Sequence, residues 1–405
     1  MKKNLFLAVF AAVFVCLIFQ HCTKSDSEPN PAQTTITVGA LLSLTGNWSS
    51  LGINSKAALE LAAEDINKYM EGTRSVYRFA TSVYDTKLDA ALAEQAILKA
   101  MDSGISFIIG PQSSAEVSAI KSFADANNML VISQGSTAGS LSIADDNIFR
   151  FCPDDLIEGK AMANTIYKDS IKGLVTVCRD DAGNKGLQTS TGDAFTALRG
   201  TVAAVSPYGT TSTDFSSVLA DIKNKLQSFA PLMPAQTAVY LASFDEATEL
   251  FKQAATDPLL SSVKWYGADG VALSAALLSD AGAAGFAATT HFFAPTFGLP
   301  VQAQSKWMPL AQAIKARTGI DPDAFALAAY DALWVIALTY QATAGIDADF
   351  VRLKSVFAKQ AGIYYGVTGP TLLNEFGDRA IGSFDYWGIV SENGAYVWKL
   401  AGKSE

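Results

Sequence analysis

Short apolar runs alternate with amphipathic segments along most of the chain. The run at residues 36–42 predicts a strand, and the segment 53–70 after it predicts a helix, because small and aliphatic residues recur there every three or four positions. After about residue 156 the same alternation resumes without repeating the sequence. Strands alternating with helices of this length are typical of parallel sheets covered by helices. We therefore predict an α/β fold with two doubly wound parallel-sheet lobes.

The predicted elements form a first series, a second series and a C-terminal group. The first series has strands at 36–42, 76–84, 105–109 and 129–132 and helices at 53–70, 88–102 and 115–127. The second has helices at 156–168, 185–198, 215–229 and 246–255 and strands at 174–178, 202–206, 238–241, 263–266 and 291–294. The last group has helices at 302–317 and 324–344 and strands at 383–390 and 396–400. A cleft between two such lobes is a preferred place for a small ligand.

Two hydroxyl-rich loops follow neighbouring strands of the first series. The strand at 105–109 leads into a loop that ends at Ser114, and the strand at 129–132 leads into a loop that contains Gly135 and Thr137. In open parallel sheets ligands collect beyond the carboxyl ends of the strands, where helix N-termini offer unpaired N–H groups to an anion. The two loops therefore predict a site for a small carboxylate.

The first residues have the pattern of an export signal. Two lysines precede an apolar run at 5–19, which is short for a membrane span, and Cys22 follows the run. Residues 22–35 are small, polar and proline-containing, as in a flexible tether. This order resembles a bacterial lipoprotein leader, which implies a signal peptide at 1–21, a lipid on Cys22 and a location in the periplasm or cell envelope.

The leader also departs from the lipoprotein pattern. Phe19-Gln20-His21 stands before the cysteine, where small residues are usual. An ordinary secretory leader that yields a soluble periplasmic protein is therefore the alternative. Both alternatives predict an exported protein.

Composition narrows the classes of protein further. Hydrophobic residues make up 49% and charged residues 17%, as in packed globular proteins. The formal charge of −9 argues against nucleic-acid binding, which depends on an excess of positive charge. Four cysteines are present, of which only Cys152 and Cys178 lie in the predicted lobes, and two packed free thiols are expected there rather than a disulfide. No metal-binding or nucleotide-binding motif is found, so we expect no metal and no cofactor.

Several short motifs occur in the order found in one family. They resemble the periplasmic branched-chain amino-acid-binding proteins, which are type I solute-binding proteins of ABC transporters. The resemblance covers residues 36 to about 400 and rests on Val38-Gly39-Ala40, Leu44-Thr45-Gly46, Ala63-Glu64-Asp65-Ile66-Asn67, Ile109-Gly110, Asp180-Asp181 and Tyr266-Gly267-Ala268-Asp269-Gly270-Val271.

The resemblance implies two lobes that close on a ligand by a hinge motion. Three crossovers are expected near residues 150–154, 292–296 and 366–370. Lobe 1 then comprises residues 36–150 and 296–366, and lobe 2 comprises residues 151–295 and 367–405.

The resemblance also assigns roles to residues. Ser114, Gly135 and Thr137 would hold the ligand's α-carboxylate and part of its ammonium, and Asp269 would be the counter-charge of the ammonium. Hydroxyl groups suit this task because they donate to a carboxylate and accept from an ammonium. Turn residues remain the alternative for Thr137 and Asp269. Ser113 fits a capping box and is assigned mainly to that.

Aromatic residues cover the ligand in this family. The candidates are Trp48, after the first strand, and Phe244, which stands where the family has a tyrosine. The family's other tyrosine aligns with Gly183, with Asn184 beside it, so one wall of the pocket is remodelled. The resemblance therefore leaves the identity of the ligand open.

Together these features predict a binding protein and not an enzyme. We expect a monomer, tethered to the membrane through its lipid, that closes on a small amino acid or related zwitterion and presents the closed form to an ABC permease. The segment around Thr137 superficially matches a nucleophile elbow, but it lacks the serine, and His291 is the one histidine after the leader. A ligand-sensing receptor module and a carboxylate-based hydrolase are the alternatives.

Overall fold

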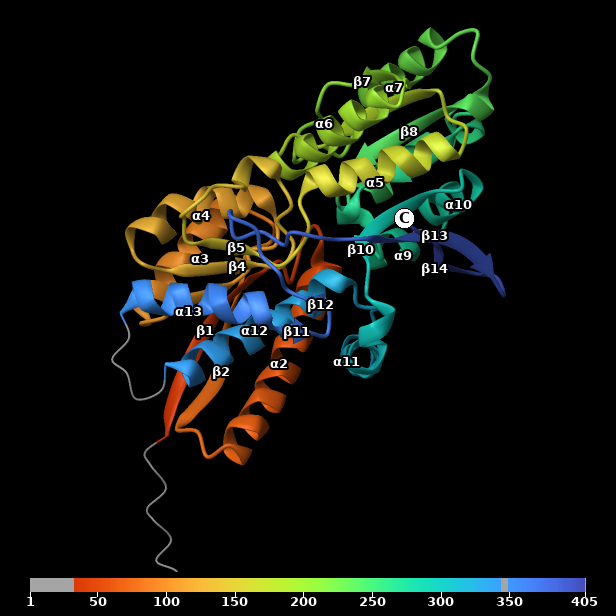
Figure 1. Ribbon diagram of the computed structural model, residues 1–405. Helices are drawn as coiled ribbons and strands as arrows, with labels where there is room; N and C mark the ends of the chain where they lie inside the picture. Colours follow the sequence, from red (N-terminus) through yellow and green to blue (C-terminus); the bar gives the residue numbers. More distant parts are fainter. Residues whose placement is uncertain (1–32, 344–348, 405) are drawn as a thin grey trace, which may run out of the picture.

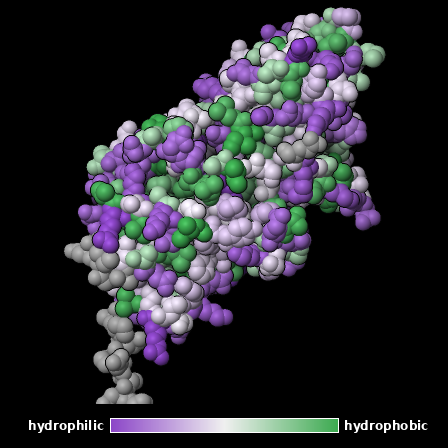
Figure 2. Space-filling view, viewed as in Figure 1, coloured by the Kyte–Doolittle hydropathy of each residue, from purple (hydrophilic) through white to green (hydrophobic). Residues whose placement is uncertain are grey.

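Two sheets form the framework of the protein, and they lie in the two lobes of an elongated molecule (Figure 1). The computed structural model describes residues 33–343 and 349–404. The predicted signal peptide, Cys22 and residues 23–32 of the tether lie outside the described residues, so these predictions remain predictions. Figure 2 shows hydrophilic and hydrophobic residues mixed over the face in view.

The first sheet is parallel throughout, in the order β2-β1-β3-β4-β5. Its residues alternate between two cores: Val38 and Ala40 belong to the core shared with α2 and α12, whereas Leu41 belongs to the core shared with α3 and α4. Its elements are β1 (Thr34–Leu42), α2 (Ser49–Gly72), β2 (Tyr77–Asp85), α3 (Ala90–Asp102), β3 (Phe107–Ile109), α4 (Ser114–Ala126), β4 (Leu130–Ser133), β5 (Ile148–Arg150), α11 (Gln304–Thr318), α12 (Ala324–Ala342) and α13 (Phe350–Ile363).

The second sheet has the order β14-β13-β10-β9-β8-β6-β7, with an antiparallel edge made by β13 and β14. Its other strands are parallel. Its elements are α5 (Asp155–Lys168), β6 (Gly173–Cys178), α6 (Ala182–Ala197), β7 (Thr201–Ala204), α7 (Ser216–Ser228), β8 (Thr237–Ala242), α8 (Ala247–Ala254), β9 (Lys264–Gly267), α9 (Ala275–Ser279), α10 (Ala281–Thr289), β10 (Phe293–Phe297), β13 (Phe384–Glu392) and β14 (Ala395–Lys403).

The predicted α/β class with two doubly wound sheets is confirmed. The short helices α9 and α10 and the helix α13 were not predicted. β10 keeps Thr296 in the second sheet and ends at Phe297, next to the crossover predicted near residues 292–296. The region 366–370 forms a small hairpin of β11 (Tyr365–Gly366) and β12 (Gly369–Pro370), and the chain enters the second sheet again only at β13. The assignment of residues to lobes stays a proposal.

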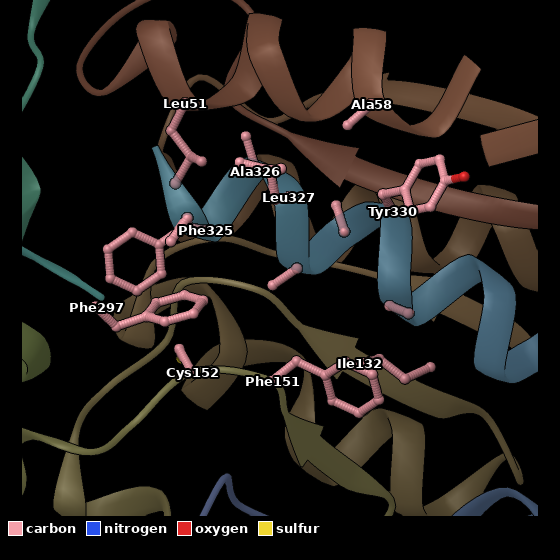
Figure 3. Close-up of a cluster of buried hydrophobic side chains, with 14 of the residues drawn as sticks. Leu51, Ala58, Ile132, Phe151, Cys152, Phe297, Phe325, Ala326, Leu327 and Tyr330 are labelled. Carbon is pink, nitrogen blue, oxygen red and sulfur yellow. The ribbon is translucent and has the colours of Figure 1, made fainter. Parts of the chain in front are cut away.

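One hydrophobic core runs through both lobes. It joins the buried face of α12 to residues of α2, β4, α5 and β8. Figure 3 shows Phe297 beside Phe325, and their ring centroids lie 5.1 Å apart. α12 is long and apolar enough to cross a membrane, but 72% of its apolar window is buried inside the protein, as in a core helix. Cys152 and Cys178 are buried free thiols, as predicted.

A buried ion pair joins two of the segments that connect the lobes. Arg150 ends β5, and its Nε and Nη2 atoms each lie 2.5 Å from a carboxylate oxygen of Asp378, in the segment that leads to β13. The backbones of the two segments also pair, because Arg150 donates to Gly377 and accepts from Arg379. Both charged side chains are almost fully buried. The geometry is bidentate, which is the strong form of this contact.

We expect Asp378→Ala to destabilise the protein by about 3–5 kcal/mol, because it leaves the guanidinium of Arg150 buried without its partner. Urea unfolding followed by circular dichroism would measure the loss. Glu392→Ala is the matched control: it breaks the exposed ion pair with Lys399 and should cost less than about 1 kcal/mol. Equal losses in the two variants would contradict the assigned importance of the buried pair.

Candidate functional site

The loop after β3 is held in place by a glycine and a helix cap. Gly110 has φ +87°, and a Cβ there would lie 2.1 Å from the carbonyl oxygen of Leu41, so only glycine fits. Ser113 caps α4 in a capping box with Glu116, which confirms its predicted capping role. Ser114 is therefore presented at the first turn of α4, where backbone N–H groups favour an anion.

The loop after β4 is bonded to the loop after β3. The hydroxyl of Ser133 donates to the carbonyl of Pro111 at 2.6 Å and accepts from the backbone N–H of Ser136 at 3.0 Å. Ser114 Oγ accepts from Ser136 Oγ at 3.0 Å and from the N–H of Ala138 at 3.1 Å. A hydroxyl that already accepts two hydrogen bonds keeps its own proton to donate, which suits a carboxylate.

Gly135 lies between these loops and an aromatic wall. A Cβ at Gly135 would lie 3.2 Å from the ring of Trp48, which is buried. The Trp48 ring centroid is 4.9 Å from that of Phe244 in the second lobe and 6.1 Å from that of Phe325 at the start of α12. The two aromatic residues predicted to cover the ligand therefore contact each other directly. Nε1 of Trp48 is buried without a hydrogen-bond partner among the described residues.

Polar contacts also join the two lobes around this wall. The N–H of Trp48 donates to Asp245 Oδ2 at 2.7 Å, and Asn47 Nδ2 donates to Glu246 Oε2 at 3.0 Å. The N–H of Ala275 donates to the hydroxyl of Ser50 at 3.1 Å. Because each contact links the first lobe to the second, the structure shows a closed arrangement.

Three carboxylic acids, here called the acidic cluster, lie behind the wall: Asp155, Glu158 and Asp269. Asp155 and Glu158 are one turn apart at the start of α5, and the N–H of Asp269 donates to Glu158 Oε1 at 3.3 Å. The N–H of Asp155 donates to the carbonyl of Thr137 at 2.8 Å, which connects the cluster to the β4 loop. The exposed fraction of each acid is 5% or less. Asp269 is thus deeply buried at the interface, where the ammonium of a ligand was predicted.

Some carboxylate oxygens of the acidic cluster make no hydrogen bond. Among the described residues, Oε2 of Glu158 and Oδ2 of Asp269 lack a partner, whereas the hydroxyl of Thr137 and the N–H of Gly139 lie beside the carboxylate of Asp155 and act to lower its pKa. Burial raises the pKa of Asp155 to about 7, and burial together with the neighbouring acids raises the pKa values of Glu158 and Asp269 well above their ordinary values. A buried carboxylate without a partner is costly, so the cluster favours a positively charged ligand group or bound protons.

The remaining predicted residue has a structural partner. Asn184 is buried in the first turn of α6, where its Nδ2 donates to Asp181 Oδ2 at 2.8 Å. Beside it, Gly183 lies against Ser114, since a Cβ there would be 3.4 Å from Ser114 Oγ. The start of α6 therefore lies against the hydroxyl loop of the first lobe.

A cavity of about 410 Å³ lies between the two lobes and is lined by residues of both. Ser113 and Phe244 line it, together with Asn47, Lys87, Arg179 and Asp181. The structure therefore places Trp48, Ser114, Gly135, Thr137 and Asp269 at the inner interface, and Ser113 and Phe244 at the cavity.

Sequence reasoning missed several residues of this site. Gln112 accepts from the N–H of Ser43 at 3.1 Å and donates to the carbonyl of Trp48 at 2.9 Å, so it orders the loops. Asp155 and Glu158 look like ordinary acids at a helix start, which the helix dipole favours. One feature could have identified them. Asp154 already caps α5 by accepting from two backbone N–H groups, so the helix start does not need the carboxylates of Asp155 and Glu158 as caps.

Comparison with known proteins agrees with this geometry. Residues 54–392 match the family described as receptor family ligand binding region. An uncharacterized protein of Methanocaldococcus jannaschii is 30% identical over 97% of this chain and 95% of its own length. The Leu/Ile/Val-binding protein homolog 3 of Brucella melitensis biotype 1 is 28% identical over 46% of this chain and 48% of its own length.

Solved structures share the fold at lower identity. The LivJ substrate-binding protein of a branched-chain amino-acid transporter of Streptococcus pneumoniae, in complex with isoleucine, has a TM-score of 0.74 and 21% identity, covering 92% of this chain and 99% of its own. A solute-binding protein of an ABC transporter of R. palustris, in complex with benzoate, has a TM-score of 0.72 and 20% identity, covering 92% and 98%. The chain thus belongs to the family described as receptor family ligand binding region, and it has the type I periplasmic binding protein fold of these solved structures.

Proposed function

We propose that this protein is the extracytoplasmic substrate-binding component of an ABC transporter. It binds a small amino acid or related zwitterion between its lobes, closes by hinge motion and presents the closed form to a permease in the inner membrane. A lipid on Cys22 tethers it to the membrane, and it acts as a monomer. The Leu/Ile/Val-binding relatives and the isoleucine-bound neighbour support this class of ligand.

The proposal rests on one observation: a hydrogen-bond donor without an acceptor lies on one side of the closed interface, and a carboxylate oxygen without a donor lies on the other. On one side, Ser114 keeps a hydroxyl proton to donate at the start of α4. On the other side, Asp269 has a buried carboxylate oxygen with no partner among the described residues. A backbone hydrogen bond from the N–H of Asp155 to the carbonyl of Thr137 links the two sides. A zwitterion has both a carboxylate and an ammonium, so it could satisfy both sides at once.

We expect Asp269→Asn to weaken amino-acid binding about ten- to a hundredfold, since a hydrogen bond to a charged group contributes about 1.5–3 kcal/mol. Thermal unfolding against a panel of amino acids, amides and simple carboxylates would show this, because a ligand at a hundred times its dissociation constant stabilises by about 2.7 kcal/mol. Asp102→Asn, at the exposed end of α3, is the control and should leave the shifts unchanged. Shifts with carboxylates alone, or with none of the panel, would contradict the amino-acid assignment.

The ligand-free protein should lose stability as the pH rises. Asp155 has a pKa of about 7 in the folded protein against an ordinary value of 3.8, so the folded state holds its proton more strongly and the free energy of unfolding falls between about pH 4 and pH 7. Asp155→Asn removes this loss. We expect it to stabilise the ligand-free protein more at pH 8 than at pH 5, by on the order of a few kcal/mol.

Urea unfolding at the two pH values would measure this difference. The control Asp102→Asn should change the free energy of unfolding equally at both. An equal effect of Asp155→Asn at pH 5 and pH 8 would show that the Asp155 carboxyl group titrates normally.

A further inference from the structure

The acidic cluster holds more carboxylates than one ammonium group needs. An aliphatic amino acid is a neutral zwitterion, and its ammonium would face Asp269 in the proposed binding mode. Asp155 and Glu158 would then stay buried and uncompensated, although each is only 1% exposed. Removing a carboxylate from water without a partner is among the most costly events in a protein interior. The cluster therefore matches a ligand with more positive charge than leucine or isoleucine.

Local structure does not account for the two acids of α5. Asp154, not Asp155, caps this helix, and Oε2 of Glu158 has no hydrogen-bond partner among the described residues. Bound protons would let the acids donate to one another or to nearby hydroxyls, whereas a cationic ligand would supply the donors with the acids ionised. The side chain of Asp155 also packs tightly on α6, where a Cβ at Gly186 would lie 2.0 Å from Asp155 Oδ2.

A second, independent group points into the same region. Tyr240 lies on β8 with its side chain fully buried, and its hydroxyl lies beside the hydroxyl of Thr191. After burial, the charge of Glu158 is the largest influence that raises the pKa of this hydroxyl, so the phenol and the acid are close. Thr191 on α6 is likewise fully buried, so the two hydroxyls have no contact with solvent. These neutral oxygens can accept hydrogen bonds from a ligand with several N–H donors.

The described residues offer no cation of their own to the cluster. Arg150 is the nearby positive charge that acts on Asp155, but its guanidinium already bonds to Asp378, to the carbonyls of Ser136 and Ala138 and to the hydroxyl of Ser142. Within residues 33–343 and 349–404, no group of three His, Cys, Asp or Glu side chains is arranged to hold a metal ion. Because the three acids do not converge on one point, they suit an organic cation whose N–H groups lie on different atoms.

We propose that the interlobe site binds a small ligand with two cationic nitrogen groups, the chemistry shared by basic amino acids and diamines. One group faces Asp269, and the second faces Asp155 and Glu158 at the start of α5, with the hydroxyls of Tyr240 and Thr191 as further acceptors. This inference rests on the proposed binding function and narrows its ligand class. A carboxylate on the ligand, where present, faces the Ser114 hydroxyl.

Isothermal titration calorimetry on the wild-type protein with lysine, arginine, 1,4-diaminobutane, leucine and isoleucine would test the inference. We expect lysine or arginine to bind at least about tenfold more tightly than leucine, as one additional charged contact implies. Tight binding of 1,4-diaminobutane in place of the amino acids would also support the dicationic class, but it would overturn the amino-acid assignment. Leucine binding as tightly as every dication would overturn the inference and leave the proposed function standing. Binding of none of the five would overturn both.

Variants then locate the second cationic group. We expect Glu158→Gln to weaken the preferred dication about ten- to a hundredfold and to leave the thermal stability of the ligand-free protein unchanged or higher. Glu94→Gln, which neutralises an exposed acid of the same type on α3, is the matched control. Unchanged dication affinity in a folded Glu158→Gln protein would overturn the placement. If that variant does not fold, the ligand preference of the wild type decides.

Discussion

The guanidinium of Arg150 is the contact on which the hinge and the binding loop both depend. It binds Asp378 in the segment that leads to β13, and it also donates to the carbonyls of Ser136 and Ala138 in the loop after β4. One side chain therefore links a connection between the lobes to the loop that faces the ligand. A lysine could not replace it, because only the planar guanidinium offers five donors in a fixed geometry.

Closure brings together groups that the protein cannot satisfy by itself. The aromatic pair Trp48 and Phe244 excludes water, and behind it the acidic cluster keeps oxygens of Glu158 and Asp269 without partners. In the open state water would solvate these oxygens, so closing without a ligand carries a desolvation cost. A ligand that supplies the missing donors removes this cost and shifts the population toward the closed state. In the proposed binding cycle, the same unsatisfied groups would contribute both to the affinity for the ligand and to the coupling of binding to closure.

The fold leaves the choice of ligand to a few positions. Structural neighbours with nearly equal similarity hold isoleucine in one case and benzoate in another. In this chain Gly183 faces Ser114, and Phe244 packs on Trp48. The acids of α5 add negative charge to the same interface. Function in such folds is decided by the chemistry of the site and not by the scaffold.

The sequence by itself determined the alternation of strands and helices, the α/β class and the Ser113 cap, because hydrophobic periodicity and capping depend on residues a few positions apart. It missed α10, where an alanine-rich and glycine-rich stretch has no apolar stripe, and it missed the acidic cluster. Glu158 and Asp269 are 111 residues apart, and Arg150 and Asp378 are 228 apart. Only the tertiary structure decides which distant charges meet, since their burial and pairing arise from the packing of the two lobes and not from local sequence.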